Sequence, residues 1–508
     1  MPNPLYNALL APAADNPAPF LRDATGDVTS YGAFHDRVAQ AANVLVALGL
    51  KPGDRLALQV GKSQMALAIY GACLVRGVIF LPLNTAYTPA EIGYFLNDAT
   101  PALLVCDPGA APALTPLADR TGTQVLTADA TGAGSFADLA DAQFTTCPVA
   151  DRITDDIATL LYTSGTTGRS KGAMLSHGNL LSNAQTLCAE WRIDAIDTLL
   201  HALPIFHAHG LFVALNTTLL AGAQMIFLPG FDIDAVLCAL PHATTMMGVP
   251  TFYTRLLDDP RFDTAACANM RLFVSGSAPL LADTHAAFEA RTGHRILERY
   301  GMTETSMNTS NPYVGERRAG SVGFPLPGIE LRVTDAEAEV PQGGIGMIEV
   351  RGPNVFKGYW NMPEKTAEDM RNDGFLITGD LGRIDDDGYV HIVGRNKDLV
   401  ISGGYNVYPK EVELAIDTAP WVRESAVIGV PHPDFGEAVV AVIVPVDGAA
   451  PDLDGLRADL KTRMANYKRP KEMVIVDALP RNTMGKVQKN VLRDSYAGLF
   501  TAQATGTG

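Results

Sequence analysis

One short stretch of the sequence brings together glycines, hydroxyl side chains and cations: it reads "YTSGTTGRSKG" and covers residues 162–172. Glycines allow the backbone to approach an oxyanion, and N–H groups and hydroxyls can then surround a polyphosphate. The stretch departs from the Walker A pattern G-x-x-x-x-G-K-[ST], because Ser170 replaces the second glycine and Gly172 replaces the Ser/Thr. The loop therefore predicts phosphate binding by a protein outside the P-loop NTPases, although the loop alone is also consistent with a polar surface turn.

Four later segments carry residues that could act on the same nucleotide. They read "RYGMTET" (299–305), "TGD" (378–380), "GRNKDLVISGGYNVYP" (394–409) and "PRNTMGKVQK" (480–489). With the loop, and in this order, they resemble the signature motifs of the adenylate-forming superfamily, which contains acyl-CoA synthetases, luciferases and the adenylation domains of peptide synthetases. The resemblance covers essentially the whole chain. It implies an enzyme that uses ATP and Mg²⁺ to convert a carboxylic acid into an acyl-AMP, with coenzyme A as the co-substrate of a second step.

The resemblance also implies a role for each motif residue in the first step, in which a carboxylate oxygen attacks the α-phosphorus of ATP and pyrophosphate leaves. Positioning and charge neutralisation dominate such a step. Lys486 would pair with both the α-phosphate and the carboxylate, and Thr303 would contact the α-phosphate. Glu304 and Thr163 would serve the magnesium ion. The implied ATP-binding residues are Thr163, Ser164, Gly165, Thr166, Thr167, Gly168, Lys171, Ser277, Ala278, Pro279, Tyr300, Gly301, Met302, Thr303, Asp380, Arg395 and Lys486.

Other residues are implied in the transfer of the acyl group to coenzyme A. Lys397 falls at the family's hinge, where rotation of a small domain lets one site serve both steps. The segment around Gly403, Gly404 and Tyr405 resembles the one that lines the pantetheine tunnel. Residues 457–493 include ten basic and three acidic side chains, which is consistent with a solvated helix face or with a surface for the CoA phosphates. Within that range the candidates are Lys468 and Arg469.

Two arginines suggest which acid is activated. Arg299 directly precedes "YGMTE", and Arg255 lies in "GVPTFYTRLL" (248–257). A buried cation beside an acyl pocket is costly unless an anion pairs with it. Either arginine therefore predicts a second carboxylate on the substrate, bound in bidentate fashion. The alternative is that an arginine pairs with a carboxylate of the protein itself, such as Glu298 or Glu304.

Two longer stretches, "LERYGMTETSMNTSNPY" and "LPIFHAHGLFVALN", are similar to those of malonyl-CoA synthetases. This similarity implies malonate as the substrate, with methylmalonate as the alternative, and a pocket shaped by His207, Met302 and Ser277. His207 is also consistent with a packed residue beside Phe206. The competing hypotheses are a CoA ligase for another short or dicarboxylic acid, and a stand-alone adenylation domain that loads a carrier protein in trans. Acetylation of Lys486 would remove the charge that the first step needs, which makes it a candidate form of regulation.

The elements expected around these residues alternate between strand and helix. Residues 30–50 have helical periodicity, and short apolar runs read as strands at 54–60, 102–107, 198–204, 224–229, 244–250 and 272–278. Such alternation predicts a multidomain α/β fold with layered, mostly parallel sheets. We expect a large N-terminal domain over residues 1–395, with a β-rich subdomain at about 319–395, and a small mobile α+β domain over residues 396–508.

Composition limits the remaining options. The chain has 508 residues, too many for a single core, and its net charge of −16 argues against a general nucleic-acid or anionic-membrane binder. The six cysteines show no CxxC spacing, so we expect reduced thiols and no cysteine metal site. The start of the chain lacks the features of a secretory signal, and the apolar window from Met65 contains Arg76 and Gly77. A buried helix that runs into a strand is expected there rather than a membrane span, and the expected location is the cytoplasm.

Overall fold

The computed structural model describes residues 3–163, 170–335, 338–402, 405–482 and 485–500. The chain divides into two compact units, the first made of residues 1–331 and 350–376 and the second of residues 332–349 and 377–508. Residues 377–395 thus group with the C-terminal part of the chain, whereas the sequence placed them in the N-terminal domain. The division at residue 395 stays a prediction about domain motion.

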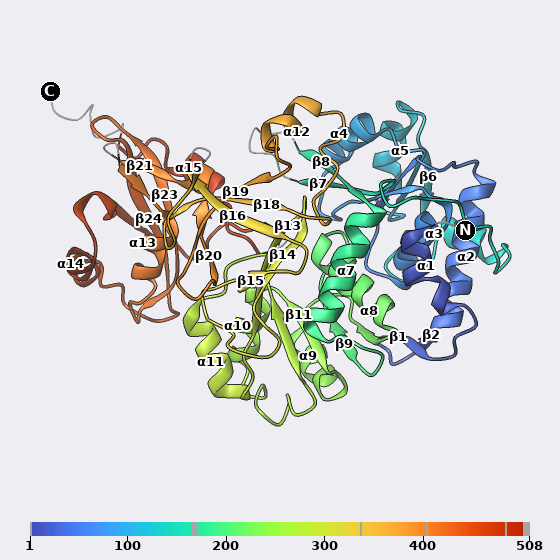
Figure 1. Ribbon diagram of the computed structural model, residues 1–508, viewed down its shortest axis with the longest axis horizontal. Coiled ribbons are helices and arrows are strands. Elements are labelled where there is room, and N and C mark those ends of the chain that lie inside the picture. The colour runs from blue at the N-terminus through green and yellow to red at the C-terminus, as the bar shows by residue number, and fades with distance from the viewer. Residues whose placement is uncertain (1–2, 164–169, 336–337, 403–404, 483–484, 501–508) are drawn as a thin grey trace. The chain divides into compact units, whose positions relative to one another are not determined.

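The larger sheet of the first unit is mostly parallel (Figure 1). Its inner strands β11 and β12 are fully buried, as expected for a parallel sheet that helices cover. In spatial order the strands are β15 (Phe324–Pro325), β14 (Ser306–Ser310), β13 (Leu297–Met302), β12 (Leu272–Ser275), β11 (Thr245–Gly248), β9 (Thr198–His201), β10 (Gln224–Phe227), β1 (Pro19–Asp23) and β2 (Val28–Ser30).

A smaller sheet of the first unit contains the strands that flank the phosphate loop. Its order is β6 (Gln124–Thr127), β5 (Leu103–Cys106), β3 (Arg55–Gln59), β4 (Ile79–Pro82), β7 (Ile157–Thr163) and β8 (Lys171–Ser176). Neighbouring strands are parallel until the last pair, where β8 returns antiparallel to β7. The strands expected from the sequence lie in these two sheets, and the predicted α/β fold is confirmed.

Helices pack around both sheets, and Figure 1 shows α9 to α11 beside β9 and β11. The helices of this unit are α1 (Pro4–Leu9), α2 (Tyr31–Ala47), α3 (Gln64–Arg76), α4 (Pro89–Ala99), α5 (Ala111–Asp119), α6 (Ser135–Asp141), α7 (His177–Trp191), α8 (Asn216–Ala221), α9 (Ile233–Ala239), α10 (Pro250–Asp258), α11 (Ala282–Thr292) and α12 (Pro363–Asp369).

The apolar window from Met65 forms the helix and strand that the sequence predicted. Helix α3 begins after Ser63, whose side chain accepts a hydrogen bond from the backbone of Ala66. It ends at Gly77, which has φ of 65°, a left-handed conformation that glycine adopts without steric cost. The chain then enters the buried strand β4.

The second unit contains the β-rich segment and the C-terminal segment. The β-rich sheet has the order β17 (Ala338–Glu339), β16 (Glu330–Asp335), β18 (Gly346–Arg351), β19 (Leu376–Ile384) and β20 (Val390–Arg395). The C-terminal sheet has the order β22 (Tyr405–Val407), β21 (Val400–Ser402), β24 (Gly436–Pro445) and β23 (Val422–His432), with β25 (Glu472–Ile475) also paired to β24. Its helices are α13 (Pro409–Ile416), α14 (Leu453–Arg463) and α15 (Lys489–Tyr496).

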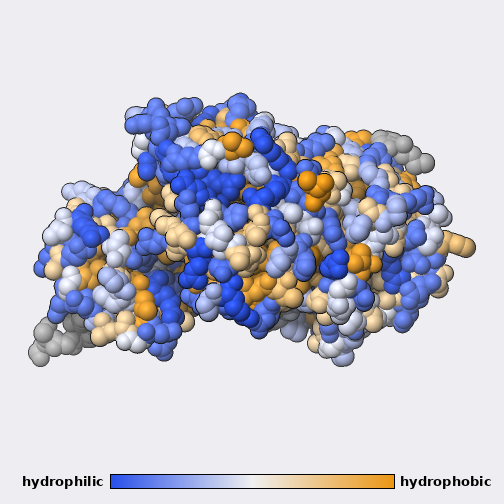
Figure 2. Space-filling view, turned by 90° about the horizontal axis from the view of Figure 1, so that it is seen from below, coloured by the Kyte–Doolittle hydropathy of each residue, from blue (hydrophilic) through white to orange (hydrophobic). Residues whose placement is uncertain are grey.

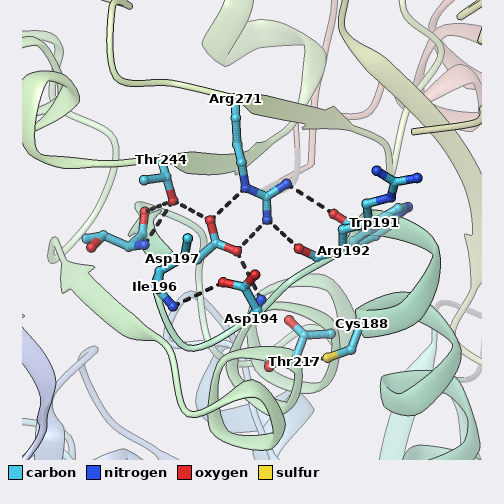
Figure 3. Close-up of polar contacts among 10 residues, drawn as sticks. Cys188, Trp191, Arg192, Asp194, Ile196, Asp197, Thr217, Thr244 and Arg271 are labelled. Atoms are coloured by element: carbon cyan, nitrogen blue, oxygen red, sulfur yellow. Dashed lines mark hydrogen bonds and ion pairs between the residues drawn. The ribbon is translucent and has the colours of Figure 1, made fainter. Parts of the chain in front are cut away.

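An ion pair between a partly exposed arginine and a buried aspartate connects the amino ends of three strands of the larger sheet (Figure 3). Arg271, just before β12, forms a bidentate contact with Asp197, just before β9, with Nε lying 2.7 Å from Oδ1. The same carboxylate accepts a 2.6 Å hydrogen bond from Thr244, just before β11. Burial alone would raise the pKa of Asp197, but the hydrogen bonds from Arg271 and Thr244 lower it below its usual value.

Removing the cation of this pair should destabilise the first unit. Arg271→Ala would leave Asp197, which is 2% exposed, without its cationic partner, with Thr244 still donating to the carboxylate. Breaking a fully buried pair costs about 3–5 kcal/mol, which is the upper bound for this pair because Arg271 is partly exposed. Because the folded pKa of Asp197 is lowered, this stabilisation is present at neutral pH and is lost as the pH falls through that pKa. In urea unfolding we therefore expect Arg271→Ala to have a lower free energy of unfolding than the wild type at pH 7, and we expect this difference to shrink below about pH 4. A difference that is the same at all pH values would contradict the role assigned to the ion pair.

No helix in the described part of the chain is long and apolar enough to cross a bilayer. Figure 2 shows hydrophilic and hydrophobic residues interspersed over one face of the molecule, which is ordinary for folded domains. The cytoplasmic location stays a prediction.

Candidate active site

Several residues of the first unit that are predicted to bind the acid and the nucleotide lie at one edge of the larger sheet. Strands β11, β12 and β13 run parallel, so their carboxyl ends meet at the same edge. The segment 276–279 follows β12, and the signature residues Thr303 and Glu304 follow β13. Ligands in open α/β sheets bind outside the carboxyl ends of the strands. The structure therefore brings together the predicted residues from 277 to 304, which are far apart in the sequence.

The turn after β13 depends on a glycine. Gly301 lies so close to the next strand, β14, that a Cβ added there would lie 1.8 Å from the carbonyl oxygen of Ser306. Ser306 itself has φ of 53°, and the backbone N–H of Thr305 donates to the carbonyl of Met302. This tight turn presents Thr303 and Glu304 at the edge of the sheet.

The phosphate loop is bracketed by paired strands. Thr163, the last residue of β7, lies opposite Lys171, the first residue of β8. The Lys171 ammonium lies 3.6 Å from a carboxylate oxygen of Asp369 on α12 and 4.3 Å from the centre of the Tyr359 ring. Lys171 thus has a protein counterion where the sequence predicts a phosphate. The predicted residues Ser164, Gly165, Thr166, Thr167 and Gly168 lie outside the described residues.

Glu304 fits a magnesium ion that the phosphates of ATP help to hold. Its carboxylate is 6% exposed, and its Oε1 accepts a 3.0 Å hydrogen bond from Tyr359. Within the described residues, no group of three or more His, Cys, Asp or Glu could hold a metal ion by itself. Mg²⁺ is commonly bound by one or two carboxylates together with substrate phosphates, which is the arrangement that a single carboxylate at this edge supports.

Arg299 is a buried cation with unsatisfied donors. It is 3% exposed, and its Nε and Nη2 have no hydrogen-bond partner among the described residues. Burial lowers the pKa of Arg299 to about 10, and Tyr253 and Glu298 oppose that shift only in part. The guanidinium packs so closely on Gly276 that an added Cβ would lie 2.3 Å from its Cζ. These features leave a buried positive charge with two donors that no described residue accepts, and no space for a side chain at position 276.

A histidine and a serine with a strained backbone lie near this cation, and a second histidine lies near the first. His209 is 3% exposed and its Nδ1 lies 3.3 Å from the hydroxyl of Ser277, while its Nε2 has no partner among the described residues. Burial and then the charge of Arg299 hold the pKa of His209 well below its usual value, so the ring is neutral. Ser277 has φ of 70°, which is costly for a residue other than glycine and is common at functional sites. Burial lowers the pKa of His207 to about 4.

His209 was missed by the sequence analysis, which chose His207 from the same "HAHG" stretch. His209 opens a π-helical segment (His209–Leu215), and such segments occur often at functional sites. The two histidines are equivalent in the local sequence pattern, so only the fold distinguishes the one that contacts Ser277.

Arg255 does not share the environment that the sequence predicted for it. Tyr253 and Leu256 form the buried side of α10, and the Arg255 side chain is exposed. An exposed cation needs no substrate anion to offset desolvation. The prediction of a buried Arg255 is therefore wrong, and the argument for a second carboxylate rests on Arg299.

In the second unit, the structure brings the predicted ribose and catalytic residues together. Asp380 on β19 lies opposite Arg395 on β20, and Arg395 Nε lies 3.0 Å from Asp380 Oδ1. Burial and then the charge of Arg395 lower the pKa of Lys486 to about 8. Asp380 opposes this shift and Lys397 adds to it, so all four side chains lie near one another.

Contacts of residues 481, 482 and 485–487 hold Lys486 in that position. Arg481 and Val487 form an isolated β-bridge, and the backbone N–H of Lys486 donates to the Asn482 side chain at 2.9 Å. Arg481 donates to the carbonyl of Gly485 and pairs with Glu424 on β23. Lys489, the other lysine of this motif, lies 2.5 Å from the Glu413 carboxylate. The ammonium of Lys489 therefore connects α15 to α13.

The coenzyme A candidates are less clearly arranged. Tyr405 is 59% exposed and stacks on Tyr467, with ring centres 4.7 Å apart. The Lys468 ammonium is engaged by Glu411 at 2.6 Å, so it is not an open phosphate contact in this structure. Arg469 is partly buried, and Gly403 and Gly404 lie outside the described residues.

Comparison with known protein families shows to which family the chain belongs. The model for AMP-binding enzymes matches residues 11–360, and the model for their C-terminal domain matches residues 411–486. The chain belongs to the AMP-binding enzyme family. The expected resemblance to adenylate-forming enzymes is thereby confirmed, as is the expectation of an AMP-forming acid–thiol ligase at the level of the family.

Several members of the AMP-binding enzyme family are similar to this chain over most of its length. The crystal structure of ATP-bound MatB from Rhodopseudomonas palustris is 56% identical, with a TM-score of 0.97, and the match covers 98% of this chain and 100% of that one. A feruloyl-CoA synthase from Amycolatopsis sp is 39% identical, with 93% of this chain and 94% of the relative covered. A malonate–CoA ligase from Arabidopsis thaliana is 36% identical, with 82% and 74% covered.

Proposed function

We propose that this enzyme joins malonate to coenzyme A through malonyl-AMP, at the expense of ATP. The observation that carries the choice of acid is the buried guanidinium of Arg299, whose Nε and Nη2 have no partner within the described residues. A second carboxylate on the substrate would supply the missing acceptors in a bidentate pair. The similarity to a malonate–CoA ligase supports the same acid.

The first step is a transfer of the adenylyl group. One carboxylate of malonate attacks the α-phosphorus, an O–P bond forms, and the bond to pyrophosphate breaks. Arg299 holds the other carboxylate, with Ser277 and the neutral His209 beside it, while Thr163 and Lys171 bind the leaving pyrophosphate. Lys486 lowers the repulsion between the carboxylate and the α-phosphate. Bound Mg²⁺ would neutralise charge on the phosphates, with Glu304 as its protein ligand.

The second step transfers the acyl group to the thiol. The sulfur of coenzyme A attacks the carbonyl carbon of malonyl-AMP, a C–S bond forms, and the C–O bond to AMP breaks. We propose that Lys397 is the hinge at which the small domain rotates between the first step and the second. We also propose that Tyr405 lines the path of the pantetheine arm of coenzyme A. Acetylation of Lys486 would block the first step by removing its charge.

A substrate panel tests this proposal. AMP release would be measured with malonate, methylmalonate, acetate, succinate and benzoate, each with and without coenzyme A. We expect malonate to give the highest kcat/KM, methylmalonate to follow, and acetate to be poor because it leaves Arg299 unpaired. Sustained AMP release should require coenzyme A. Equal kcat/KM values for acetate and malonate would overturn the choice of acid, and a preference for succinate would favour another dicarboxylic acid.

A further inference from the structure

One aromatic side chain connects the two motifs that bind the metal and the pyrophosphate in the proposed function. The hydroxyl of Tyr359 donates to Glu304 Oε1 at 3.0 Å, and the face of its ring lies 4.3 Å from the ammonium of Lys171. Tyr359 is 4% exposed. All three residues belong to the first unit, although they come from distant parts of the sequence.

The backbone around Tyr359 is paired with both motifs as well. Tyr359 forms an isolated bridge with Ala173, and the backbone of Trp360 donates to the carbonyl of Gly172 at 2.7 Å. The backbone N–H of Phe356 donates to the carbonyl of Glu304 at 2.8 Å. One short segment, 356–360, therefore fixes the main chain of Glu304 and of the strand that begins at Lys171.

We propose that Tyr359 is a positioning residue for MgATP, whose hydroxyl orients the Glu304 carboxylate toward the metal and whose ring supports the Lys171 ammonium. The inference rests on the proposed roles of Glu304 and Lys171. A partner that donates to a ligating carboxylate fixes its orientation, and loss of such a partner typically weakens metal binding 10- to 100-fold. The ring adds a cation–π contact for Lys171 that does not depend on the metal.

The hydroxyl is available as a donor, because a tyrosine phenol is ordinarily protonated at physiological pH. Asp369 lies 3.6 Å from Lys171, so it can balance the Lys171 charge when no phosphate is bound.

Two substitutions separate the two contacts. Tyr359→Phe removes the hydroxyl and keeps the ring, whereas Tyr359→Leu removes both. The matched control is Tyr31→Phe, because Tyr31 is an equally buried tyrosine whose hydroxyl donates to the carbonyls of Thr218 and Ala223. Thermal unfolding of all three variants shows whether any loss is one of stability.

The test is ATP binding by calorimetry as a function of Mg²⁺ concentration, without any acid present. We expect Tyr359→Phe to raise the Mg²⁺ concentration for half-maximal ATP binding about tenfold or more, with little change in binding of metal-free ATP. Tyr359→Leu should also weaken metal-free binding, and Tyr31→Phe should change neither. In a Glu304→Gln background, Tyr359→Phe should cause no further shift.

Two results would overturn the inference: an unchanged Mg²⁺ dependence in Tyr359→Phe, or an equal shift in Tyr31→Phe. A full additional shift in the Glu304→Gln background would show that Tyr359 does not act through Glu304. Because no acid is present, these outcomes are independent of the malonate proposal. A failure of that proposal would appear as wild-type protein that binds MgATP but releases no malonate-dependent AMP.

Discussion

Replacing Lys486 with alanine is expected to slow the formation of malonyl-AMP by about 100- to 1000-fold, while thioester formation from supplied malonyl-AMP stays near the wild-type rate. The magnitude is that of removing one preorganised charge-stabilising group. The reason for the split is that Lys486 pairs the carboxylate with the α-phosphate only before the O–P bond exists. Single-turnover measurements of each half-reaction provide the test.

The pH dependence of kcat/KM for ATP provides an independent test of the role of Lys486. The pKa of Lys486 is lowered to about 8, and the adenylation step needs the protonated ammonium. The kcat/KM for ATP, which reports the free enzyme, should therefore fall as the pH rises through about 8. Lys486→Arg should be slower but should lack this alkaline decline, because a guanidinium stays protonated.

A control within the same unit is Lys461→Ala, because Lys461 is exposed on α14. It should leave both half-reactions and the alkaline decline unchanged. The assignment of Lys486 would be contradicted by equal losses in the two half-reactions, or by an alkaline decline that persists in Lys486→Arg.

The second large effect concerns the choice of acid. Arg299→Met keeps most of the side-chain volume but removes the donors to the distal carboxylate. Loss of one partner of a buried, hydrogen-bonded charge pair costs about 2–5 kcal/mol, so we expect kcat/KM for malonate to fall about 30-fold or more. Acetate has no distal carboxylate, and its kcat/KM should change little. The ratio of the two values is the measurement.

Gly276→Ala should also lower kcat/KM for malonate relative to acetate, although Arg299 itself is not substituted. The added Cβ would lie 2.3 Å from Arg299 Cζ, so the guanidinium must move. Arg255→Ala is the control, because that arginine is exposed on α10, and it should leave the malonate-to-acetate ratio unchanged. Parallel losses for malonate and acetate in Arg299→Met would instead indicate a structural role for Arg299.

The sequence predicted the parts of the site that lie on local motifs. The short apolar runs form strands of mostly parallel sheets, as predicted. The signature residues after β13 lie at the edge where the parallel strands β11, β12 and β13 end. Arg255 was misplaced because helical periodicity decides its exposure: Tyr253 and Leu256 take the buried side of α10, and Arg255 lies between them.

Contacts between distant segments could not be predicted in the same way. Tyr359 lies 188 residues after Lys171 and 55 residues after Glu304, and nothing in its neighbourhood of the sequence indicates that it contacts both. In the sequence, Gly276 likewise looks like an ordinary turn glycine, and only the fold shows that the Arg299 guanidinium packs against it. The grouping of residues 332–349 with residues 377–508 in one compact unit also depends on packing between distant segments. No single sequence motif predicts it.

The most direct test of the central claim follows oxygen from the acid to the nucleotide. Malonate labelled with ¹⁸O in its carboxylates would be incubated with ATP, Mg²⁺ and coenzyme A beside an equal concentration of unlabelled acetate, and the products would be analysed by mass spectrometry. We expect malonyl-CoA as the main thioester and AMP that carries one ¹⁸O atom, because the attacking carboxylate oxygen stays on the α-phosphate when the thiol displaces AMP. Unlabelled AMP formed together with malonyl-CoA, or labelled inorganic phosphate formed with ADP, would contradict the acyl-AMP route, and acetyl-CoA as the main thioester would contradict the choice of malonate.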